Sequence, residues 1–312
     1  MIRYLWSLVC YFFRPWIKWF LRQTTQMCEL QRICYGEPSG APRALAIEDS
    51  LRHSRDATIK KLLIYLDDIS DKCEITIETE QEVLQEVIKT VLLTKKINPV
   101  AHPDFAKSFG KCIELIWGYR QLCVECEELR KIPYDAENPE HEALLMKLWD
   151  SLNPDEILTS RVSKQWQHIG FQGDDPKTDF RGMGILGLSN LIYFAQEYSG
   201  TVKQVLLHSL HPRYGYPFAI VGINLTSMAL RLLRDGSAKT HIYNSSKTLP
   251  TIRAFHHFYC CLFYAFDGFW MQSKPNNMME FSSVQERFES NIRATLASPT
   301  TVFRLNVSVD NV

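Results

Sequence analysis

One arginine stands out among the side chains of this sequence that could take part in chemistry. Arg181 follows a polar run, Gly173-Asp-Asp-Pro-Lys-Thr-Asp179, and precedes an apolar stretch from Ile185 to Phe194. Glycine, aspartate and proline together predict a fixed turn, and the apolar residues recur at helical spacing. A guanidinium on a rigid turn beside a helix start has little conformational entropy left to lose. This placement suits an arginine that reaches into a partner's site.

The carboxylates of the same turn allow a plainer interpretation of Arg181. Asp174, Asp175 and Asp179 are close enough in sequence to form an internal ion pair with the guanidinium. They are also suited to accept turn and cap hydrogen bonds, and we expect Thr178 or Asp179 to cap the helix that follows. The residues alone leave both the ion pair and the outward-facing arginine open.

The glycines after Arg181 match the pattern of a dinucleotide-binding loop only formally. Gly182-Met-Gly184-Ile-Leu-Gly187 reads G-x-G-x-x-G. That loop requires a strand before it and an acidic residue about 20 positions later, and both are missing here. We therefore expect these glycines to permit close packing of a helix or close approach of a partner.

Metal-binding and hydrolase patterns are incomplete throughout the sequence. Cys123-Val-Glu-Cys126 has no second pair of ligands, so two helix thiols are the better interpretation than a zinc site. His256-His257 lack the H-E-x-x-H spacing, and their aromatic neighbours predict a packed helix. No G-x-S-x-G or G-x4-G-K-[ST] sequence occurs. We expect neither a metal nor a cofactor.

Composition bounds the class of protein without defining it. The 312 residues include 35 Lys and Arg and 35 Asp and Glu, so the formal net charge is zero. No global field favours nucleic acid or acidic substrates. The nine cysteines are odd in number and scattered, which indicates reduced thiols in a protein that faces the cytosol.

The N-terminus departs from this balance. Residues 1–21, MIRYLWSLVCYFFRPWIKWFL, are rich in aromatic residues and carry Arg3, Arg14 and Lys18 but no acid. The apolar run Tyr4–Phe13 is shorter than the about 20 residues of a membrane span, and no small-residue cleavage site follows it. The composition predicts an anchor in the membrane interface. A helix packed on the protein's own core is the alternative.

The remaining sequence predicts an all-α fold, bundle-like and built from many helices. Apolar residues recur at helical spacing from Ile47 to about Tyr134, punctuated at Asn98-Pro99 and His102-Pro103. Further helices are expected over 140–152, 184–198, 201–208, 218–233, 254–270 and 282–296. The single candidate strand is Glu74–Thr79. The expected boundaries are a membrane-associating segment 1–35, a linker 36–42, one domain 43–298 and a tail 299–312.

Residues 166–194 resemble the signature of the ELMO domain, W-x3-G-F-Q-G-x-D-P-x-T-D-F-R-G-x-G-x-x-G-L-x-x-L-x-Y-F. Every fixed position of that pattern is occupied, and the resemblance extends to Cys28–Ile33, Pro133-Tyr-Asp, His141-Glu and Phe218–Asn224. The resemblance therefore covers most of the chain and identifies it as similar to the single-domain members of the family.

The resemblance implies a GTPase-activating protein for small GTPases of the Arf and Arf-like type in their GTP-bound state. Arg181 would be the arginine finger, supported by Gln172, Asp174, Asp175 and Asp179, without a hydrolytic site in this chain. A contribution of Gln172 or Lys177 to catalysis is open. The preferred GTPase and the oligomeric state are also open.

The alternative function is a non-catalytic scaffold or adaptor that docks a small GTPase or its regulator at a membrane. The implied location is cytoplasmic, on an intracellular membrane such as the endoplasmic reticulum, a lipid droplet or a mitochondrion.

Overall fold

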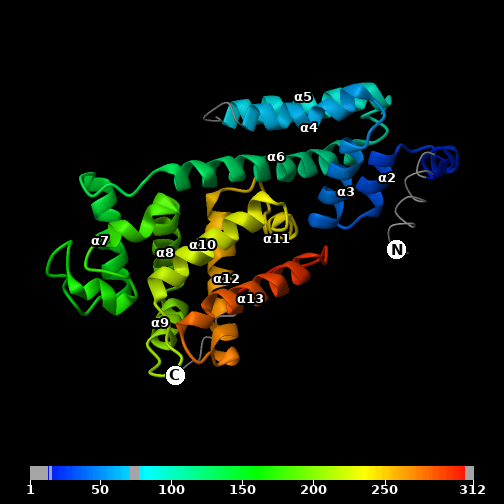
Figure 1. Ribbon diagram of the computed structural model, residues 1–312. Coiled ribbons are helices and arrows are strands. Elements are labelled where there is room, and N and C mark those ends of the chain that lie inside the picture. The colour runs from blue at the N-terminus through cyan, green and yellow to red at the C-terminus, as the bar shows by residue number, and fades with distance from the viewer. Residues whose placement is uncertain (1–12, 14–15, 71–76, 306–312) are drawn as a thin grey trace, which may run out of the picture. The chain divides into compact units, whose positions relative to one another are not determined.

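The computed structural model describes residue 13, residues 16–70 and residues 77–305 of the chain, which divides into two compact units (Figure 1). The first unit extends to Arg120 and the second begins at Gln121. The described residues are helical with no strand, so the all-α prediction is confirmed. No described helix combines the length and the apolar character needed to cross a membrane.

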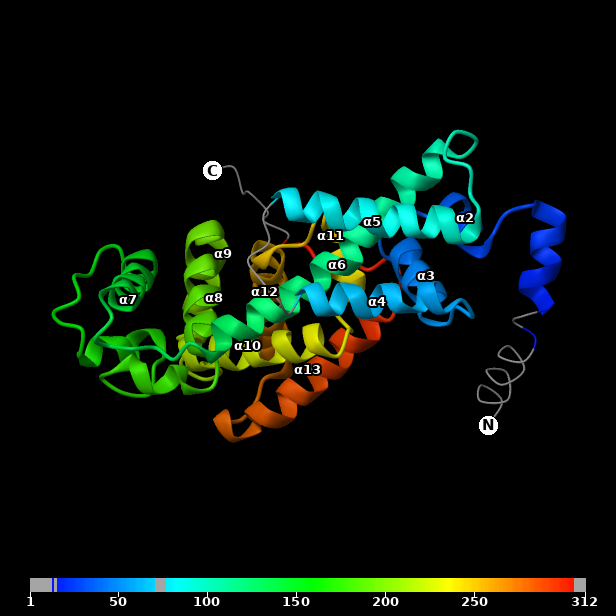
Figure 2. The same cartoon turned by 90° about the horizontal axis from the view of Figure 1, so that it is seen from above.

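The first unit consists of a helical segment over residues 16–25 followed by longer helices. Their bounds are α2 Glu29–Gly36, α3 Ala41–Arg52, α4 Ala57–Ser70, α5 Ile77–Lys95 and the first part of α6 Pro103–Lys131. Consecutive helices pack in pairs, α2 on α3, α3 on α4 and α4 on α5. Figures 1 and 2 both show α4 and α5 running side by side in opposite directions.

The core of the first unit follows the apolar face of each helix. On α4, for example, the buried residues recur three or four positions apart, which is the spacing of one helix face. Fully buried apolar side chains of this unit include Ile47, Leu51, Leu66, Val87, Val91, Phe105, Phe109 and Trp117. Arg120 lies at the edge of this core. Its guanidinium pairs with Asp67 and, at 3.3 Å, with the buried Glu48.

The second unit contains the end of α6 and the remaining helices. Their bounds are α7 Pro139–Leu152, η1 Lys164–Ile169, η2 Pro176–Arg181, α8 Gly184–Glu197, α9 Ser199–Ser209, α10 Phe218–Arg234, α11 Lys239–Ser245, α12 Ile252–Ser273, η3 Met278–Glu280 and α13 Phe281–Leu296. Helices α8, α10 and α12 contact one another, while α7 packs on α8 and α13 on α12.

The core of the second unit is rich in aromatic rings from α12. Its fully buried members are Phe255, Phe258, Tyr259, Phe263, Phe266 and Trp270. Several buried polar groups between the helices are hydrogen bonded. Asn190 on α8 donates to Thr226 at 3.0 Å and contacts His256 Nδ1 at 2.6 Å, while Tyr216 donates to Asp267 at 2.7 Å. These bonds fix the register of α8, α10 and α12.

Most expected helices lie where periodicity placed them, within a few residues at each end. Helix α6 begins at Pro103, where proline is favoured at the first helical position. The strand prediction for Glu74–Thr79 is wrong for residues 77–79, which belong to α5, and its first part lies outside the described residues. Helices α2 and α3 pack together across the segment expected as a linker, and the chain divides into its two units after Arg120.

Candidate functional site

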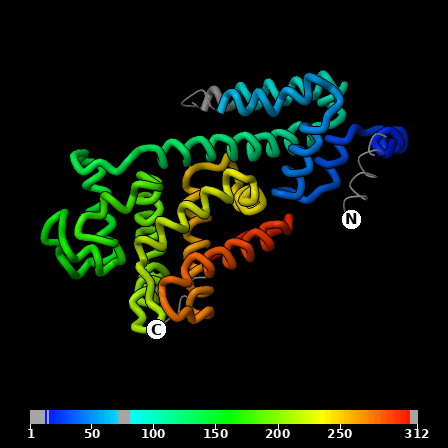
Figure 3. Tube along the Cα trace, viewed as in Figure 1, coloured from blue at the N-terminus to red at the C-terminus, as the bar shows by residue number. Residues whose placement is uncertain are grey.

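The signature residues 166–194 form a loop with two short helical turns that leads into a core helix. In the trace of Figure 3 the green segment passes through η1 and η2 and enters α8. Trp166 lies in η1, Arg181 is the last residue of η2, and Tyr193 and Phe194 lie on α8. The loop is therefore attached to the core at both ends.

A row of buried aromatic rings forms the floor of this loop. Trp149 contacts Trp166 at 5.3 Å between ring centroids, Trp166 contacts Phe171 at 5.6 Å, and Phe171 contacts Phe180 at 5.7 Å. Tyr134 completes the row, 5.7 Å from Phe180. Burial of such large rings contributes strongly to stability. Because Phe180 is fully buried, the backbone of the next residue, Arg181, is held in place.

Two glycines with positive φ allow the loop to approach the rest of the unit. Gly170 has φ 84°, and a Cβ there would lie 2.3 Å from the backbone nitrogen of Phe218. Gly184 has φ 51°, and a Cβ there would lie 2.3 Å from the carbonyl oxygen of Ile132. The amide of Ile185 donates to that same carbonyl at 3.0 Å. Only glycine fits such a conformation at such a distance.

Asp175 holds the turn together rather than binding Arg181. Its carboxylate accepts a hydrogen bond from the backbone nitrogen of Lys177, which caps η2, and pairs with Arg161 at 2.8 Å. Lys177 Nζ lies 3.8 Å from the other oxygen. The expected cap of α8 by Thr178 or Asp179 is wrong, because α8 begins at Gly184 and has no side-chain cap. The side-chain cap in this segment is instead that of Asp175, at the start of η2.

The other two aspartates also have partners within the loop. Asp174 accepts from the side chain of Gln167 at 2.8 Å, and its carbonyl accepts from the amide of Ser163 at 2.9 Å. Asp179 accepts from the backbone nitrogen of Gln172 at 3.0 Å. Burial raises the pKa of Asp179, while the Gln172 hydrogen bond and the charge of Arg181 oppose that rise. The side chain of Gln172 is exposed.

Arg181 itself is exposed and makes no hydrogen bond or ion pair with any residue that the structure describes. Of the two interpretations left open by the sequence, the geometry therefore favours the outward-facing arginine over the internal ion pair. A planar cation with five donors, fixed at its backbone and free at its tip, can bind an anion of a partner protein.

The remaining candidate sites have structural explanations. Gly187 packs beside Phe180 and Ile223, whereas the space around Gly182 is open. Cys123 and Cys126 are thiols on α6; Cys126 is buried, and Cys123 donates to the carbonyl of Leu233 at 3.9 Å. Within the part of the chain that the structure describes, no group of His, Cys, Asp or Glu has the geometry of a metal site.

The predicted N-terminal anchor falls largely outside the described residues. Its described part is helical over residues 16–25 and exposes its aromatic side chains. Trp16, Trp19 and Phe20 are 71%, 59% and 60% exposed. Such exposure of tryptophan is unusual for a helix packed on its own core.

Comparison with known proteins agrees with the signature. The sequence model of the ELMO/CED-12 family matches residues 124–285, which include the loop and helices α7 to α12. ELMO domain-containing protein 2 of Bos taurus is 45% identical over 286 residues, with 92% of each chain covered. The chain belongs to the ELMO/CED-12 family.

Other relatives in the ELMO/CED-12 family also match over nearly their full length. ELMO domain-containing protein 1 of Mus musculus is 43% identical, with 93% of this chain and 90% of the relative covered. ELMO domain-containing protein B of Dictyostelium discoideum is 36% identical, with 88% and 92% covered. The similarity thus extends into the first unit, beyond the residues that the family model matches.

Two residues that hold the loop were not expected from the sequence. Arg161 lies 14 positions before its partner Asp175, and Gln165 bonds to Thr159, Ser163 and Glu156. No local pattern marks either residue, because each acts across a loop rather than along a helix. Their role is to order the segment before η1.

Proposed function

We propose that this protein is a GTPase-activating protein for small GTPases of the Arf and Arf-like type, and that Arg181 enters the partner's nucleotide site. The GTP-bound form of the GTPase is the partner. The reaction takes place in that partner's site, and this chain contributes one side chain rather than a hydrolytic site of its own.

The main support is the contrast between Arg181 and its surroundings. The three aspartates of the loop have other hydrogen-bond partners, and Asp175 pairs with Arg161 instead. The guanidinium of Arg181 is exposed on a turn whose next-door ring, Phe180, is fully buried. Because the backbone is already ordered, little entropy is lost when the arginine binds.

Transfer of the γ-phosphoryl group to water builds negative charge on the phosphate oxygens. An arginine supplied in trans stabilises that charge and raises the rate by about 10³–10⁵. The planar guanidinium contacts two oxygens at once, whereas a lysine ammonium acts as a point charge. The Arg181→Lys variant therefore keeps the positive charge but removes the planar guanidinium, so it tests which of the two the reaction requires.

The test is stimulated GTP hydrolysis by purified Arf and Arf-like GTPases in single turnover. Arg181→Lys is expected to lose at least about a hundredfold in stimulated rate, with binding to the GTP-bound partner retained. Its melting temperature should stay unchanged, because exposed substitutions without partners alter stability by about 0.5 kcal/mol or less. Arg287→Lys, an exposed arginine on α13, is the matched control and should stimulate normally.

Each other outcome of this experiment has a defined meaning. Full stimulation by Arg181→Lys would contradict the arginine-finger proposal. Loss of binding together with loss of rate would favour the non-catalytic scaffold or adaptor. Early melting would mean that Arg181 has a structural role.

We further propose that the N-terminal segment holds the protein on the cytosolic face of an intracellular membrane. The support is the exposed aromatic surface of residues 16–20 together with the basic residues around it. Deletion of residues 1–22 should move the protein from the membrane fraction to the soluble fraction. Unchanged fractionation would contradict this part of the proposal.

A further inference from the structure

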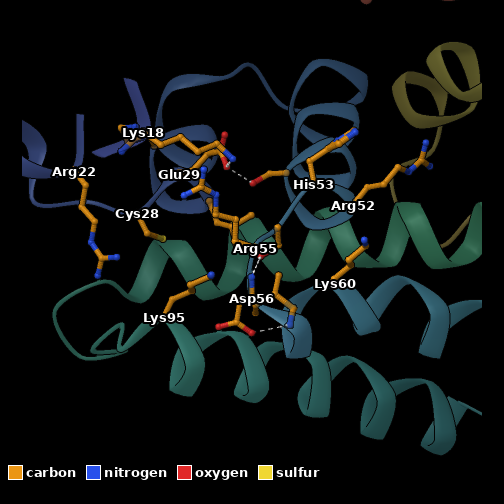
Figure 4. Close-up of a pocket in the computed structure, with 15 residues that line it drawn as sticks. Lys18, Arg22, Cys28, Glu29, Arg52, His53, Arg55, Asp56, Lys60 and Lys95 are labelled. Carbon is orange, nitrogen blue, oxygen red and sulfur yellow. Dashed lines mark hydrogen bonds and ion pairs between the residues drawn. The ribbon is translucent and has the colours of Figure 1, made fainter. Parts of the chain in front are cut away.

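A cavity of about 820 Å³ lies within the first unit, which is a volume typical of ligand pockets. Its lining comes from four parts of the chain: the helical segment 16–25, the start of α2, the stretch from the end of α3 through the turn to the start of α4, and the end of α5. Figure 4 shows Arg22, Arg55, Lys60 and Lys95 placed around it. We call it the basic pocket.

The basic pocket carries a strong excess of positive charge. Its lining includes seven Lys or Arg side chains and only the carboxylates of Glu29 and Asp56. This excess arises in a chain whose total formal charge is zero. Gathering like charges without equal countercharge costs free energy, so such a cluster indicates an anionic ligand.

Both carboxylates are already engaged. Glu29 pairs with Lys18 and accepts from Ser50 at 2.7 Å, while Asp56 accepts from the backbone nitrogens of Thr58 and Ile59 and so caps α4.

Most of the cations have no acidic partner. Among the residues that the structure describes, no ion pair forms at five of the seven, namely Arg22, Arg32, Arg55, Lys60 and Lys95. The lining also includes the buried apolar side chains of Leu30 and Ile59, which are 2% and 1% exposed. Cations beside buried apolar groups interact with an anion more strongly than cations in open solvent.

The helical segment 16–25 connects the pocket to an apolar surface. Lys18 and Arg22 line the pocket, while Trp16, Trp19 and Phe20 on the same helix are exposed. Aromatic side chains of this kind partition into the membrane interface, where lipid phosphates lie at the same depth. A membrane lipid therefore matches the combination of pocket cations and exposed aromatic side chains better than a free anion does.

We propose that the basic pocket binds the headgroup of a lipid that carries several phosphates, of the polyphosphoinositide class, while Trp16, Trp19 and Phe20 insert beside it. This inference deepens the proposed membrane contact and is independent of the role of Arg181. Several phosphates match several unpaired cations, whereas a singly charged headgroup would leave most of them without a counterion.

The experiment measures binding of the full chain to phosphatidylcholine vesicles that contain phosphatidylinositol bisphosphate. Vesicles in which phosphatidylserine supplies the same total charge are the comparison. We expect tighter binding to the bisphosphate vesicles. Equal binding at equal charge would overturn the proposal, because it would show diffuse electrostatic attraction.

Two adjacent lysines give a matched pair of variants. Lys60 lines the pocket, whereas Lys61 is exposed on the same helix and does not. Lys60→Gln should weaken bisphosphate-vesicle binding about fivefold, and the double variant Arg55→Gln/Lys60→Gln about twenty-five-fold. Lys61→Gln should change it less than about twofold, and equal losses at the two lysines would contradict a defined pocket.

Binding of soluble inositol trisphosphate distinguishes recognition of a membrane lipid from recognition of a free phosphate compound. The double variant Trp16→Ala/Trp19→Ala should lose vesicle binding and keep binding of the soluble headgroup. Unchanged vesicle binding by that variant would overturn the lipid assignment. The Lys60→Gln variant should still stimulate GTP hydrolysis by a soluble GTPase that lacks its own membrane anchor. Failure of the lipid-binding proposal can therefore be distinguished from failure of the GTPase-activating proposal.

Discussion

The signature loop and the basic pocket present positive charge in opposite ways. Within the described residues, the loop presents Arg181 without an ion pair, on a turn fixed by buried rings. Five cations of the pocket, on long side chains from separate segments, also form no ion pair with a described residue. A single cation in a fixed position suits the transition state of phosphoryl transfer, in which negative charge builds up on the phosphate oxygens at a defined position. Several adaptable cations suit a multiply charged ligand that must only be held.

The comparison depends first on the loop being rigid, and the largest expected effect comes from its glycines. Gly184→Ala should destabilise the protein by about 3–5 kcal/mol, because a Cβ at positive φ would press into the Ile132 carbonyl. Thermal unfolding measures this change. Gly182→Ala is the control from the same motif, since no atom lies within 4 Å of its Cβ position. Similar losses of stability in both variants would contradict the rigidity of the signature loop, on which the comparison depends.

A smaller effect is expected from the aspartate that holds the turn. Asp175→Ala removes the η2 cap and the Arg161 ion pair, and should cost about 1–3 kcal/mol of unfolding free energy. Asp174→Ala removes only an exposed hydrogen bond to Gln167 and should cost about 0.5 kcal/mol or less. Denaturant unfolding of the two variants side by side is the measurement. A greater loss for Asp174→Ala would reverse the assignment of roles.

Acidification should affect the second unit through histidines that burial keeps neutral. Burial lowers the pKa of His241 to about 3 and that of His256 to about 4. The unfolded chain therefore binds more protons between these values and pH 6.5, so stability falls as the pH drops below 6.5. At pH 5 the loss is about 1–2 kcal/mol for each histidine.

The variant His256→Gln isolates one of these contributions. Glutamine can still bond to Asn190 but does not titrate near neutral pH. Melting of this variant should depend less on pH than that of the parent. An equally steep pH dependence would show that His256 is not responsible.

The sequence predicted the helices but not the contacts between loops. Apolar periodicity located α7 and α10 closely, because one buried face repeats along each helix. It placed the cap of α8 wrongly, because the start of that helix is set by the distant carbonyl of Ile132. Local pattern contains no information about such a contact.

The candidate site was predictable only in part for the same reason. The position of Arg181 on a fixed turn follows from the residues beside it, whereas the pairing of Asp175 with the distant Arg161 does not. The basic pocket was not predicted, although Lys18, one of its cations, belongs to the basic N-terminal segment. Its cations lie in four segments, and a net charge of zero conceals them.

The central claim is that Arg181 stabilises the transition state of the partner's reaction. Its most direct test is the affinity for an Arf-type GTPase loaded with GDP and aluminium fluoride, which resembles the phosphoryl group in transfer. The parent chain should bind this form at least about a hundredfold more tightly than the form with GDP alone. Arg181→Ala should lose most of that preference while it still binds the GTP form. An undiminished preference for the aluminium fluoride form in Arg181→Ala would contradict the account.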